Sequence, residues 1–481
     1  MYSVINLLFL AIDWMEQNLL YLNGIFAILL IFFQRKNPKA VWAWLLAFYC
    51  LPVVGLLLYL ILEQDLYKSH MFRVKCRIDE KNVKGQELPV TEKYPEGCED
   101  LIGYNREAGG FVYTDNNKVE LITDGIEKFR RLLQEIDRAV QYIHMEYYII
   151  REDELFEEIT KHLIKKASQG VEVRILYDGM GSRKFSSAAR KRLQKHGIRV
   201  GIFFPARFGV VHMRLNYRNH RKIVVIDGKV GFTGGFNIGR EYISCEEKYG
   251  YWRDTHLVLT GNAVTALQIR FALDWNYAVK ENLFQNQSYF LDYPEEWTGH
   301  QGVQVITSGP DSPYQHIRNT YLQMIHRARK QILIQTPYFI PDESIETALF
   351  LAAQSGVEVM LMIPCKPDHP LVYWGTWSYM GEMLRLGCRC FLYTGGFLHA
   401  KGMTVDGQIC CYGSANLDNR SFALNFEVNA VIYDRETAEQ MQRIFQEDLL
   451  HCREITVGEY ENRPLIVRVK EQISRLMAPL L

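Results

Sequence analysis

The sequence predicts an α/β protein made of two homologous lobes, in which a mixed β-sheet is flanked by helices. Two observations carry this prediction. Helical and strand patterns alternate from about residue 113 onward, which favours sheets covered by helices. The second half of the chain also repeats the first at a displacement of about 180 residues, and a single repeat of that length indicates two lobes rather than a solenoid. We expect the lobes to be related by a pseudo-twofold axis.

The repeat is visible in the predicted elements. Helical spacing over Ile126–Val140 leads into an apolar strand at Tyr142–Ile150, and the same order returns at Ile317–Arg329 and Gln331–Phe339. The segment QGVEVRIL at 169–176 matches SGVEVMLM at 355–362. Glu146 and Gln335 fall at equivalent strand positions, so the two lobes differ in chemistry there. We place the first lobe at residues 113–290 and the second at 300–481.

The N-terminal region, residues 1–62, is predicted to form a two-helix transmembrane hairpin. Ala40–Leu62 is a run of 23 residues without a charge, and Leu19–Phe33 is a shorter uncharged run of 15. A cleaved signal peptide is the alternative, but the start lacks a basic segment and a small-residue cleavage site. Basic residues flank both sides of the second run, so the orientation stays open, with cytoplasmic lobes slightly favoured. Residues 63–112 are charged and pattern-poor, and we expect an irregular linker.

The amino-acid composition limits the classes of ligand and partner to expect. Lys plus Arg number 55 and Asp plus Glu number 55, so no net field attracts a polyanion, and nucleic acid is not an expected partner. The ten cysteines form no disulfide framework. Cys388 and Cys390 lack a matching ligand cluster with zinc-like spacing, so we expect buried thiols on strands rather than a metal site.

Two stretches repeat the same chemistry in register. Residues 219–237 read NHRKIVVIDGKVGFTGGFN, and residues 398–416 read LHAKGMTVDGQICCYGSAN. When His220 is aligned with His399, both copies have Lys at plus two, Asp at plus seven, Gly at plus eight and plus fourteen, and Asn at plus seventeen. These shared residues are Lys222, Asp227, Gly228, Gly234 and Asn237 in the first copy, and Lys401, Asp406, Gly407, Gly413 and Asn416 in the second.

Each copy predicts a β-hairpin whose turn is the Asp–Gly pair. His and Lys two residues apart then project from one face of the strand, about 6.5–7 Å apart. The Asp has the opposite parity and falls at the turn, so a structural role is favoured for Asp227 and Asp406. The Asn follows the return strand and can come back beside the His and Lys.

Placed face to face, the two copies suit a phosphodiester. Lysines supply positive charge and asparagines supply neutral donors for phosphate oxygens, with turn stabilisation as the alternative for Asn237 and Asn416. One neutral His can attack phosphorus while the other, protonated, donates to the leaving alcohol. This chemistry calls for no metal or other cofactor. A lone His is usually structural, but duplication in register favours catalysis. Serine-hydrolase, Walker A and HExxH motifs are missing from the sequence.

These residues resemble the phospholipase D superfamily, whose HxKxxxxD signature occurs twice here. Nearly the whole chain is similar to the bacterial cardiolipin synthase family within it. The matching stretches are Arg35–Lys39, Trp42–Leu46, Asn216–Ile223, Gln335–Asp342, Gly413–Phe422 and Asn425–Asn429. The signature residues that the resemblance assigns to catalysis are His220, Lys222, Asp227, His399, Lys401 and Asp406.

The resemblance implies a membrane-bound phosphatidyltransferase of the bacterial cell membrane. One His would attack phosphatidylglycerol, release glycerol and carry the phosphatidyl group, and a second phosphatidylglycerol would displace it as cardiolipin. By analogy His220 is the nucleophile and His399 the acid and base. The same likeness suggests orienting carboxylates, Glu427 for His399 and Asp254 for His220, with ordinary salt bridges as the alternative. The alternative function is a membrane phospholipase D that hydrolyses phospholipid or uses another alcohol.

The C-terminal residues 464–481 have apolar residues at helical spacing, with Arg468, Lys470 and Arg475 among them. An amphipathic helix that packs its apolar face on the second lobe is favoured over a helix that lies on a membrane surface.

Overall fold

The computed structural model describes residues 18–33, 38–51, 53–55, 59, 65–83, 91, 93–205, 217–290 and 299–478. It divides into two compact units, one of residues 1–74 with 211–213 and one of residues 75–210 with 214–481. We describe each unit by itself.

The first unit contains α2 (Leu19–Phe33) and α3 (Pro38–Cys50), which pack against each other. Leu30, Phe48 and Tyr59 form its small buried cluster. Among the described residues, no helix has both the length and the apolar character needed to cross a membrane. Part of the predicted second span, including residues 56–58 and 60–62, lies outside the described residues.

The stretch 63–112, predicted to be irregular, contains two helices, α5 (Asp65–Val83) and α6 (Glu99–Gly109). Helix α6 buries Leu101, Ile102 and Asn105 against α11 and β10 of the second unit. Tyr104 Oη also accepts from Asn319 Nδ2 of α11 at 2.8 Å. Because this contact mixes apolar, amide and hydroxyl side chains, the segment shows little periodic apolar pattern, and the prediction of an irregular linker was wrong there.

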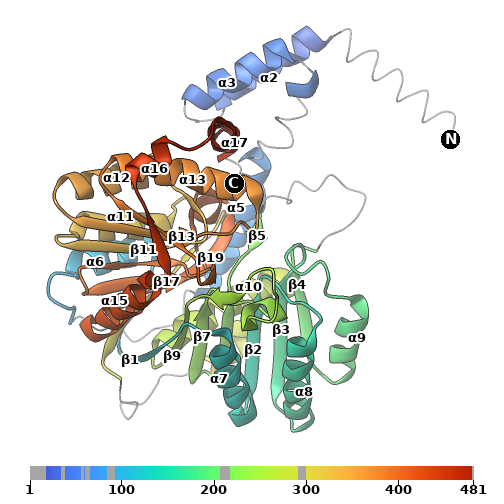
Figure 1. Cartoon of the computed structure of the whole chain (residues 1–481). Coiled ribbons are helices and arrows are strands. Elements are labelled where there is room, and N and C mark those ends of the chain that lie inside the picture. Colours follow the sequence, from blue (N-terminus) through green and yellow to red (C-terminus); the bar gives the residue numbers. More distant parts are fainter. Residues whose placement is uncertain are drawn as a thin grey trace. The chain divides into compact units, whose positions relative to one another are not determined.

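A 16-stranded sheet organises the described part of the second unit (Figure 1). Its order is β20-β14-β13-β11-β16-β17-β19-β10-β1-β9-β7-β6-β2-β3-β4, with β5 paired to β19. The strands of the first half are β1 (Tyr113–Ile122), β2 (Tyr142–Tyr147), β3 (Glu172–Asp178), β4 (Arg199–Phe203), β5 (Arg218–Asn219), β6 (Ile223–Ile226), β7 (Val230–Gly234) and β9 (His256–Thr260). Those of the second half are β10 (Gln301–Ser308), β11 (Gln331–Gln335), β13 (Glu358–Pro364), β14 (Arg389–Tyr393), β16 (Gly402–Val405), β17 (Ile409–Gly413), β19 (Asn425–Tyr433) and β20 (Cys452–Ile455).

The strand order is symmetric about the antiparallel pair β1 and β10, except that β20 extends the second half by one strand. Outward from this pair, β9, β7, β6, β2, β3 and β4 match β19, β17, β16, β11, β13 and β14 in position and direction. Tyr113 pairs with Gln304 and Thr114 with Val303 at the centre. The predicted pseudo-twofold relation of two mixed α/β lobes is therefore present, and Figure 1 shows them side by side.

Helices pack around the sheet, and several of them begin at an aspartate cap. The main ones are α7 (Gly125–Arg138), α8 (Glu154–Ser168), α9 (Ser187–Lys195), α10 (Ala263–Val279), α11 (His316–Arg327), α12 (Glu343–Gln354), α13 (Pro370–Arg385), α15 (Arg435–Leu449) and α17 (Leu465–Leu476). The carboxylates of Asp124, Asp153, Asp342 and Asp434 accept backbone N–H groups in the first turns of α7, α8, α12 and α15. Such caps stabilise a helix by about 1 kcal/mol each.

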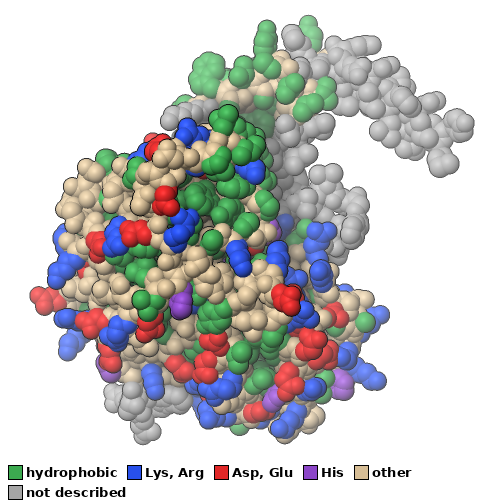
Figure 2. Space-filling view, in the orientation of Figure 1, with side chains coloured by type: hydrophobic (Ala, Val, Ile, Leu, Met, Phe, Trp, Pro, Cys, Tyr) green, Lys and Arg blue, Asp and Glu red, His purple; other side chains and the backbone are tan. Residues whose placement is uncertain are grey.

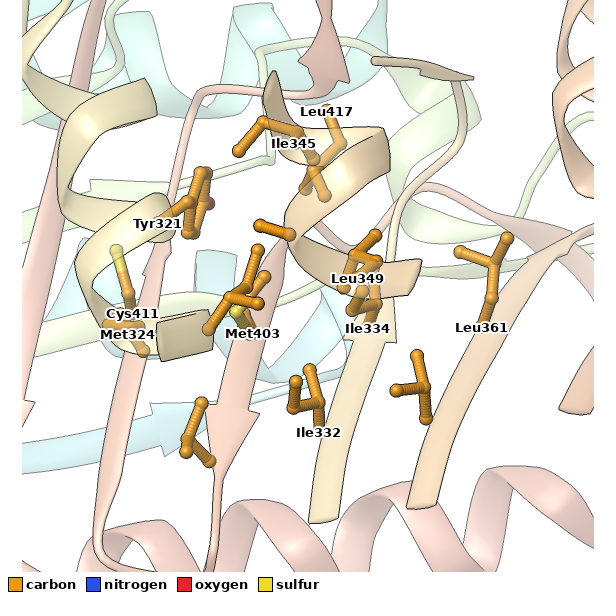
Figure 3. Close-up of a cluster of buried hydrophobic side chains, with 14 of the residues drawn as sticks. Tyr321, Met324, Ile332, Ile334, Ile345, Leu349, Leu361, Met403, Cys411 and Leu417 are labelled. Carbon is orange, nitrogen blue, oxygen red and sulfur yellow. The ribbon is translucent and has the colours of Figure 1, made fainter. Parts of the chain in front are cut away.

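Each lobe has its own apolar core. In the second lobe, Tyr321 and Met324 of α11 meet Ile345 and Leu349 of α12 over Ile334 and its neighbours on the sheet (Figure 3). Cys388, Cys390, Cys410 and Cys411 are buried, on or next to β14 and β17, as predicted for thiols on strands. Burial raises the pKa of the Cys411 thiol to about 12, so it behaves as an apolar side chain.

Candidate active site

The two repeated motifs fold as the predicted hairpins, β6–β7 and β16–β17. Asp227 and Gly228 both have positive φ, at 54° and 65°, and Asp406 and Gly407 repeat this with 54° and 64°. Positive φ at both central residues is the type I′ turn that matches the twist of paired strands.

The aspartates of the signature lie at these turns and hold backbone. The Asp227 carboxylate accepts N–H groups from Val140, Gln141 and Tyr142 at 2.7–2.8 Å. Asp406 repeats the arrangement with three consecutive N–H groups, those of residues 329–331, at 2.8 Å. Their inclusion in the catalytic set is wrong in this geometry, because the turn lies at the opposite end of the strand from His and Lys. The structural role inferred from strand parity is confirmed.

We expect Asp227→Ala to destabilise the fold and spare the chemistry. Losing the acceptor for three partly buried N–H groups should lower the free energy of unfolding by about 1–3 kcal/mol. Thermal unfolding in detergent measures this, with Asp227→Asn as the milder control because it keeps one carbonyl oxygen. Activity per folded molecule should stay within about threefold of wild type. A hundredfold loss of turnover at unchanged stability would contradict the structural role.

Each motif histidine is positioned by a short parallel strand pair that joins the lobes. Strand β5 pairs with the start of β19, and the His220 N–H donates to the Phe426 carbonyl at 2.9 Å. In the same way, β15 (Gly396–Leu398) pairs with β8 (Tyr251–Arg253), and the His399 N–H donates to the Arg253 carbonyl at 2.7 Å. Each histidine therefore lies beside the residue that follows its partner carbonyl, and that residue comes from the other lobe.

Those residues are the two carboxylates. His220 Nδ1 donates to Glu427, with Oε1 at 2.9 Å and Oε2 at 3.0 Å, and His399 Nδ1 donates to Asp254 Oδ2 at 2.6 Å. The predicted carboxylates are correct as a set, but their predicted assignment was wrong: Glu427 serves His220 and Asp254 serves His399. The assignment differs because the short parallel strand pairs β5–β19 and β8–β15 join the lobes, and no local sequence pattern predicts these pairs.

Further contacts distinguish the two carboxylates. Glu427 also accepts from Ser414 Oγ at 2.5 Å and from Asn425 Nδ2 at 3.2 Å. Asp254 accepts from the Thr255 N–H at 2.8 Å instead. The position equivalent to Ser414 is Gly235, where any Cβ would clash with the Asp254 carboxylate. The Ser414 hydroxyl therefore holds the Glu427 carboxylate, whereas the Asp254 carboxylate fits because Gly235 has no side chain.

Each motif lysine contacts the backbone of the histidine two residues before it. Lys222 Nζ donates to the His220 carbonyl at 2.6 Å, and Lys401 Nζ donates to the His399 carbonyl and lies 4.0 Å from Asp254. The ring of Tyr148 packs on His220 with centroids 4.8 Å apart, and that of Trp252 packs on His399 at 5.0 Å. Tyr148, Trp252 and Ser414 were not predicted as site residues. The available signal was position in the sequence: Tyr148 and Trp252 lie two residues from Glu146 and Asp254, respectively, and Ser414 follows Gly413 of the second motif.

Burial dominates the electrostatics of this cluster. It lowers the pKa of His220, and burial together with the charge of Lys401 lowers the pKa of His399 to about 4. Burial also lowers the pKa of Lys222 to about 7 and that of Lys401 to about 8. For Asp254 burial acts in the opposite direction, but the charges of Lys401 and His399 outweigh it and lower the pKa to about 2. An anion between the histidines would stabilise all four cationic forms.

Anion binding should therefore weaken as pH rises. With pKa values of about 7 and 8, Lys222 and Lys401 lose charge between pH 6.5 and 8.5. We expect the Kd for glycerophosphoglycerol, measured by calorimetry, to increase by about tenfold over this range. Lys222→Arg should flatten the profile, because guanidinium stays charged. A pH-independent Kd in the wild-type protein would contradict lysine titration.

The two motif asparagines hold loops in this structure. Asn237 accepts from the Ile149 N–H at 3.1 Å and donates to Tyr242 Oη at 2.9 Å. Asn416 Nδ2 donates to Asp418 Oδ2 at 3.1 Å. These contacts fit the turn-stabilising alternative and leave a second Nδ2 hydrogen on each, so phosphate contact stays a prediction.

Glu146 and Gln335 occupy equivalent strand positions, as predicted, and both are buried. Glu146 accepts from Asn219 Nδ2 at 2.5 Å, and Gln335 Nε2 donates to Asp448 Oδ2 at 2.7 Å. Burial raises the pKa of Glu146 well above its usual range. Asn219 precedes His220, and Asp448 binds Arg253, whose carbonyl accepts the His399 N–H. Glu146 and Gln335 therefore support the two histidines indirectly, and the lobes differ in the side chain that does so.

Arg221, between His220 and Lys222, holds the backbone of the β5–β19 strand pair. Its Nε donates to the Glu427 carbonyl at 3.1 Å, Nη1 to Asp274 Oδ2 at 2.5 Å and Nη2 to the Ser308 carbonyl at 3.1 Å. Since Arg221 is buried, this fork holds the backbone of Glu427 against the first motif.

Two lobes around paired His–Lys motifs define a protein of the phospholipase D class. A family model described as "Cardiolipin synthase, PLD-like domain" matches residues 132–258 and 321–449, and one described as "Phospholipase_D-nuclease N-terminal" matches 24–64. The chain is 45% identical over 471 residues to the major cardiolipin synthase ClsA of Bacillus subtilis, with 96% of this chain and 97% of that protein covered. It is 44% identical over 479 residues to a cardiolipin synthase of Staphylococcus aureus, covering 96% and 95%. The chain belongs to the cardiolipin synthase family of the phospholipase D superfamily.

A solved structure supports the fold independently. The crystal structure of phosphatidylserine synthase from Haemophilus influenzae superposes with a TM-score of 0.60 at 15% identity, covering 80% of this chain and all of that one. At this identity the likeness concerns the fold alone.

Proposed function

We propose that this chain is a phosphatidyltransferase that converts two phosphatidylglycerol molecules into cardiolipin and glycerol. The observation that carries the proposal is the pair of histidines whose Nδ1 atoms are each held by a carboxylate of the other lobe. This arrangement leaves both Nε2 atoms for chemistry. Membership of the cardiolipin synthase family supports the lipid substrate.

In the first step, His220 Nε2 attacks the phosphorus of phosphatidylglycerol. The bond from phosphorus to the glycerol headgroup oxygen breaks, and protonated His399 gives its proton to that oxygen, which leaves as glycerol. Lys222 and Lys401 neutralise the non-bridging oxygens. Because an approaching phosphate anion favours the imidazolium, substrate binding counters the burial that lowers the pKa of His399 in the empty site.

In the second step, a headgroup hydroxyl of another phosphatidylglycerol enters. His399 takes its proton, the hydroxyl oxygen attacks phosphorus, and the bond to His220 Nε2 breaks to give cardiolipin. One phosphodiester replaces another, so the exchange is reversible and its direction follows concentrations. The buried carboxylates Glu427 and Asp254 orient the two rings and stabilise their cationic forms. Asn237 and Asn416 add phosphate contacts from their remaining amide hydrogens.

The enzyme is anchored in the bacterial cell membrane as a multi-pass protein. Residues 1–62 form the transmembrane hairpin, supported by the uncharged runs Leu19–Phe33 and Ala40–Leu62 and by the N-terminal family match at 24–64. The connecting segment 63–112 joins it to the lobes at 113–290 and 300–481, which lie on the cytoplasmic side.

The test uses the purified full chain in detergent with labelled phosphatidylglycerol as the only lipid. We expect cardiolipin and glycerol in equal amounts. Phosphatidic acid as the dominant product would overturn the proposal in favour of a hydrolytic phospholipase D. The matched control is the Asp227→Asn variant, which retains the histidines and lysines and should give the same products.

A further inference from the structure

Helix α17 (Leu465–Leu476) is fastened to the second lobe by its polar face. Glu471 and Ser474 are buried, with 0% and 1% of their surfaces exposed. Arg463 Nε and Nη2 donate to the Glu471 carboxylate at 2.7 Å each, and Tyr460 Oη donates to it at 3.2 Å. The expectation that this helix packs through its apolar face was wrong, because a buried ion pair turns the polar face inward.

The apolar face is consequently left outside. Its members and exposed fractions are Leu465 75%, Ile466 60%, Val469 44%, Ile473 54%, Leu476 81% and, just after the helix, Met477 39%. At 3.6 residues per turn these six side chains fill one continuous arc of about 120°. A contiguous exposed arc of large apolar side chains is rare on the free surface of a protein and marks a contact site.

The neighbouring helix α13 (Pro370–Arg385), on which α17 packs, extends this surface. Leu371 is 48% exposed, and Trp374 lies between the helices with Lys470 Nζ 5.0 Å from its ring centroid. We call the arc of α17 together with Leu371 and Trp374 the α17 surface. Figure 2 shows hydrophobic side chains gathered over α13 and α17, with basic side chains at their edge.

The charged residues beside the apolar arc indicate what kind of partner the α17 surface binds. Lys470 follows one edge of the arc and Arg468 lies beyond the other, and both are exposed. The single acidic residue of α17, Glu471, is buried against Arg463, so the helix presents only basic charge outward. An apolar stripe bordered by basic residues is the pattern of helices that lie in the interface of an anionic bilayer.

We propose that the α17 surface docks on the anionic phospholipid bilayer, as a contact additional to the N-terminal anchor. This deepens the proposed function, because the bilayer is also where its substrate resides. Helix α13 begins two residues after Asp368, whose carboxylate accepts from Tyr338 and raises the pKa of Lys401 against the effect of burial. Helix α13 also contacts β12 (Phe339–Ile340), which pairs with β18 (Leu417–Asp418) directly after Asn416 of the second motif, so docking through α17 and α13 brings the second motif toward the lipid surface.

The test places photoreactive benzoylphenylalanine at Ile473 in the full chain, reconstituted in vesicles of equal phosphatidylglycerol and phosphatidylcholine. We expect irradiation to yield lipid adducts, identified by mass spectrometry, at least tenfold above those from the same probe at exposed Arg435 on α15. Adducts to residues 18–62 of the same chain, or to a second copy, would overturn the proposal. Equal lipid adducts at both positions would overturn it as well.

A charge variant supplies a second, functional measurement. Ile473→Glu with Leu476→Glu alters only exposed side chains, so thermal stability in detergent should not change. Cardiolipin formation on vesicles should fall at least tenfold, while activity in detergent micelles should stay within twofold of wild type. Unchanged activity on vesicles would contradict docking. If wild-type protein makes no cardiolipin but the Ile473 probe still labels lipid, the proposed function fails and the docking surface stands.

Discussion

Replacing either His220 or His399 with alanine is expected to lower cardiolipin formation by about 10⁴-fold. Each histidine supplies a function that its counterpart cannot take over, because Nδ1 is committed to a carboxylate and only Nε2 reaches the substrate. The measurement is labelled cardiolipin formed per hour by purified variants with matched thermal stability. More than one-tenth of wild-type activity in either variant would refute the paired mechanism.

An activated substrate separates the two roles. Phosphatidyl-p-nitrophenol has a leaving group that needs no proton, so the first step does not depend on the acid. His399→Asn should release about one nitrophenol per enzyme in a burst and then stall, whereas His220→Asn should give no burst. The reverse pattern would keep two-histidine chemistry but exchange nucleophile and acid.

Removing the charge of either orienting carboxylate should cost almost as much. Glu427→Gln and Asp254→Asn are each expected to reduce turnover by about 10³- to 10⁴-fold, since the amide no longer fixes the ring tautomer or stabilises imidazolium. Both carboxylates are fully buried, so water cannot replace the lost acceptor. Cardiolipin formation again gives the magnitude, and thermal unfolding provides the control for stability.

The burst assay tests the exchange of carboxylates between lobes. Because Glu427 holds His220, Glu427→Gln should slow the nitrophenol burst itself. Because Asp254 holds His399, Asp254→Asn should keep the burst and slow the turnover that follows. A lost burst in Asp254→Asn with an intact burst in Glu427→Gln would mean that each carboxylate serves the histidine of its own lobe.

Local patterns predicted much of this protein. The Asp–Gly turns, the alternation along β6 and β16 and the long-period repeat were enough to predict two α/β lobes with matching hairpins. Parity along the strand placed the signature aspartates at the turns and away from His and Lys. The turns and the alternation depend on residues within about ten positions of one another, where backbone preference and spacing decide the outcome, and the repeat is visible when the two halves of the sequence are compared.

The parts that were wrong or missing depend on distant contacts. His220 meets Glu427 across 207 positions, and His399 meets Asp254 across 145, through strand pairs only two or three residues long. A single sequence carries no register for such strand pairings, so only the assembled lobes reveal them. The orientation of α17 is the exception: its buried ion pair, Arg463–Glu471, joins residues only eight positions apart, but it overrides the usual preference for burying the apolar face, on which the prediction relied.

The bridge between lobes also fixes when the protein becomes competent during its synthesis. A ribosome completes the first motif long before it reaches strand β19 (Asn425–Tyr433), which carries the carboxylate for His220. A nascent first lobe therefore holds His220 without the carboxylate that orients it. We expect phosphatidyl transfer to begin only after nearly the whole chain has left the ribosome and the two lobes have joined, so that an incomplete chain does not attack lipid.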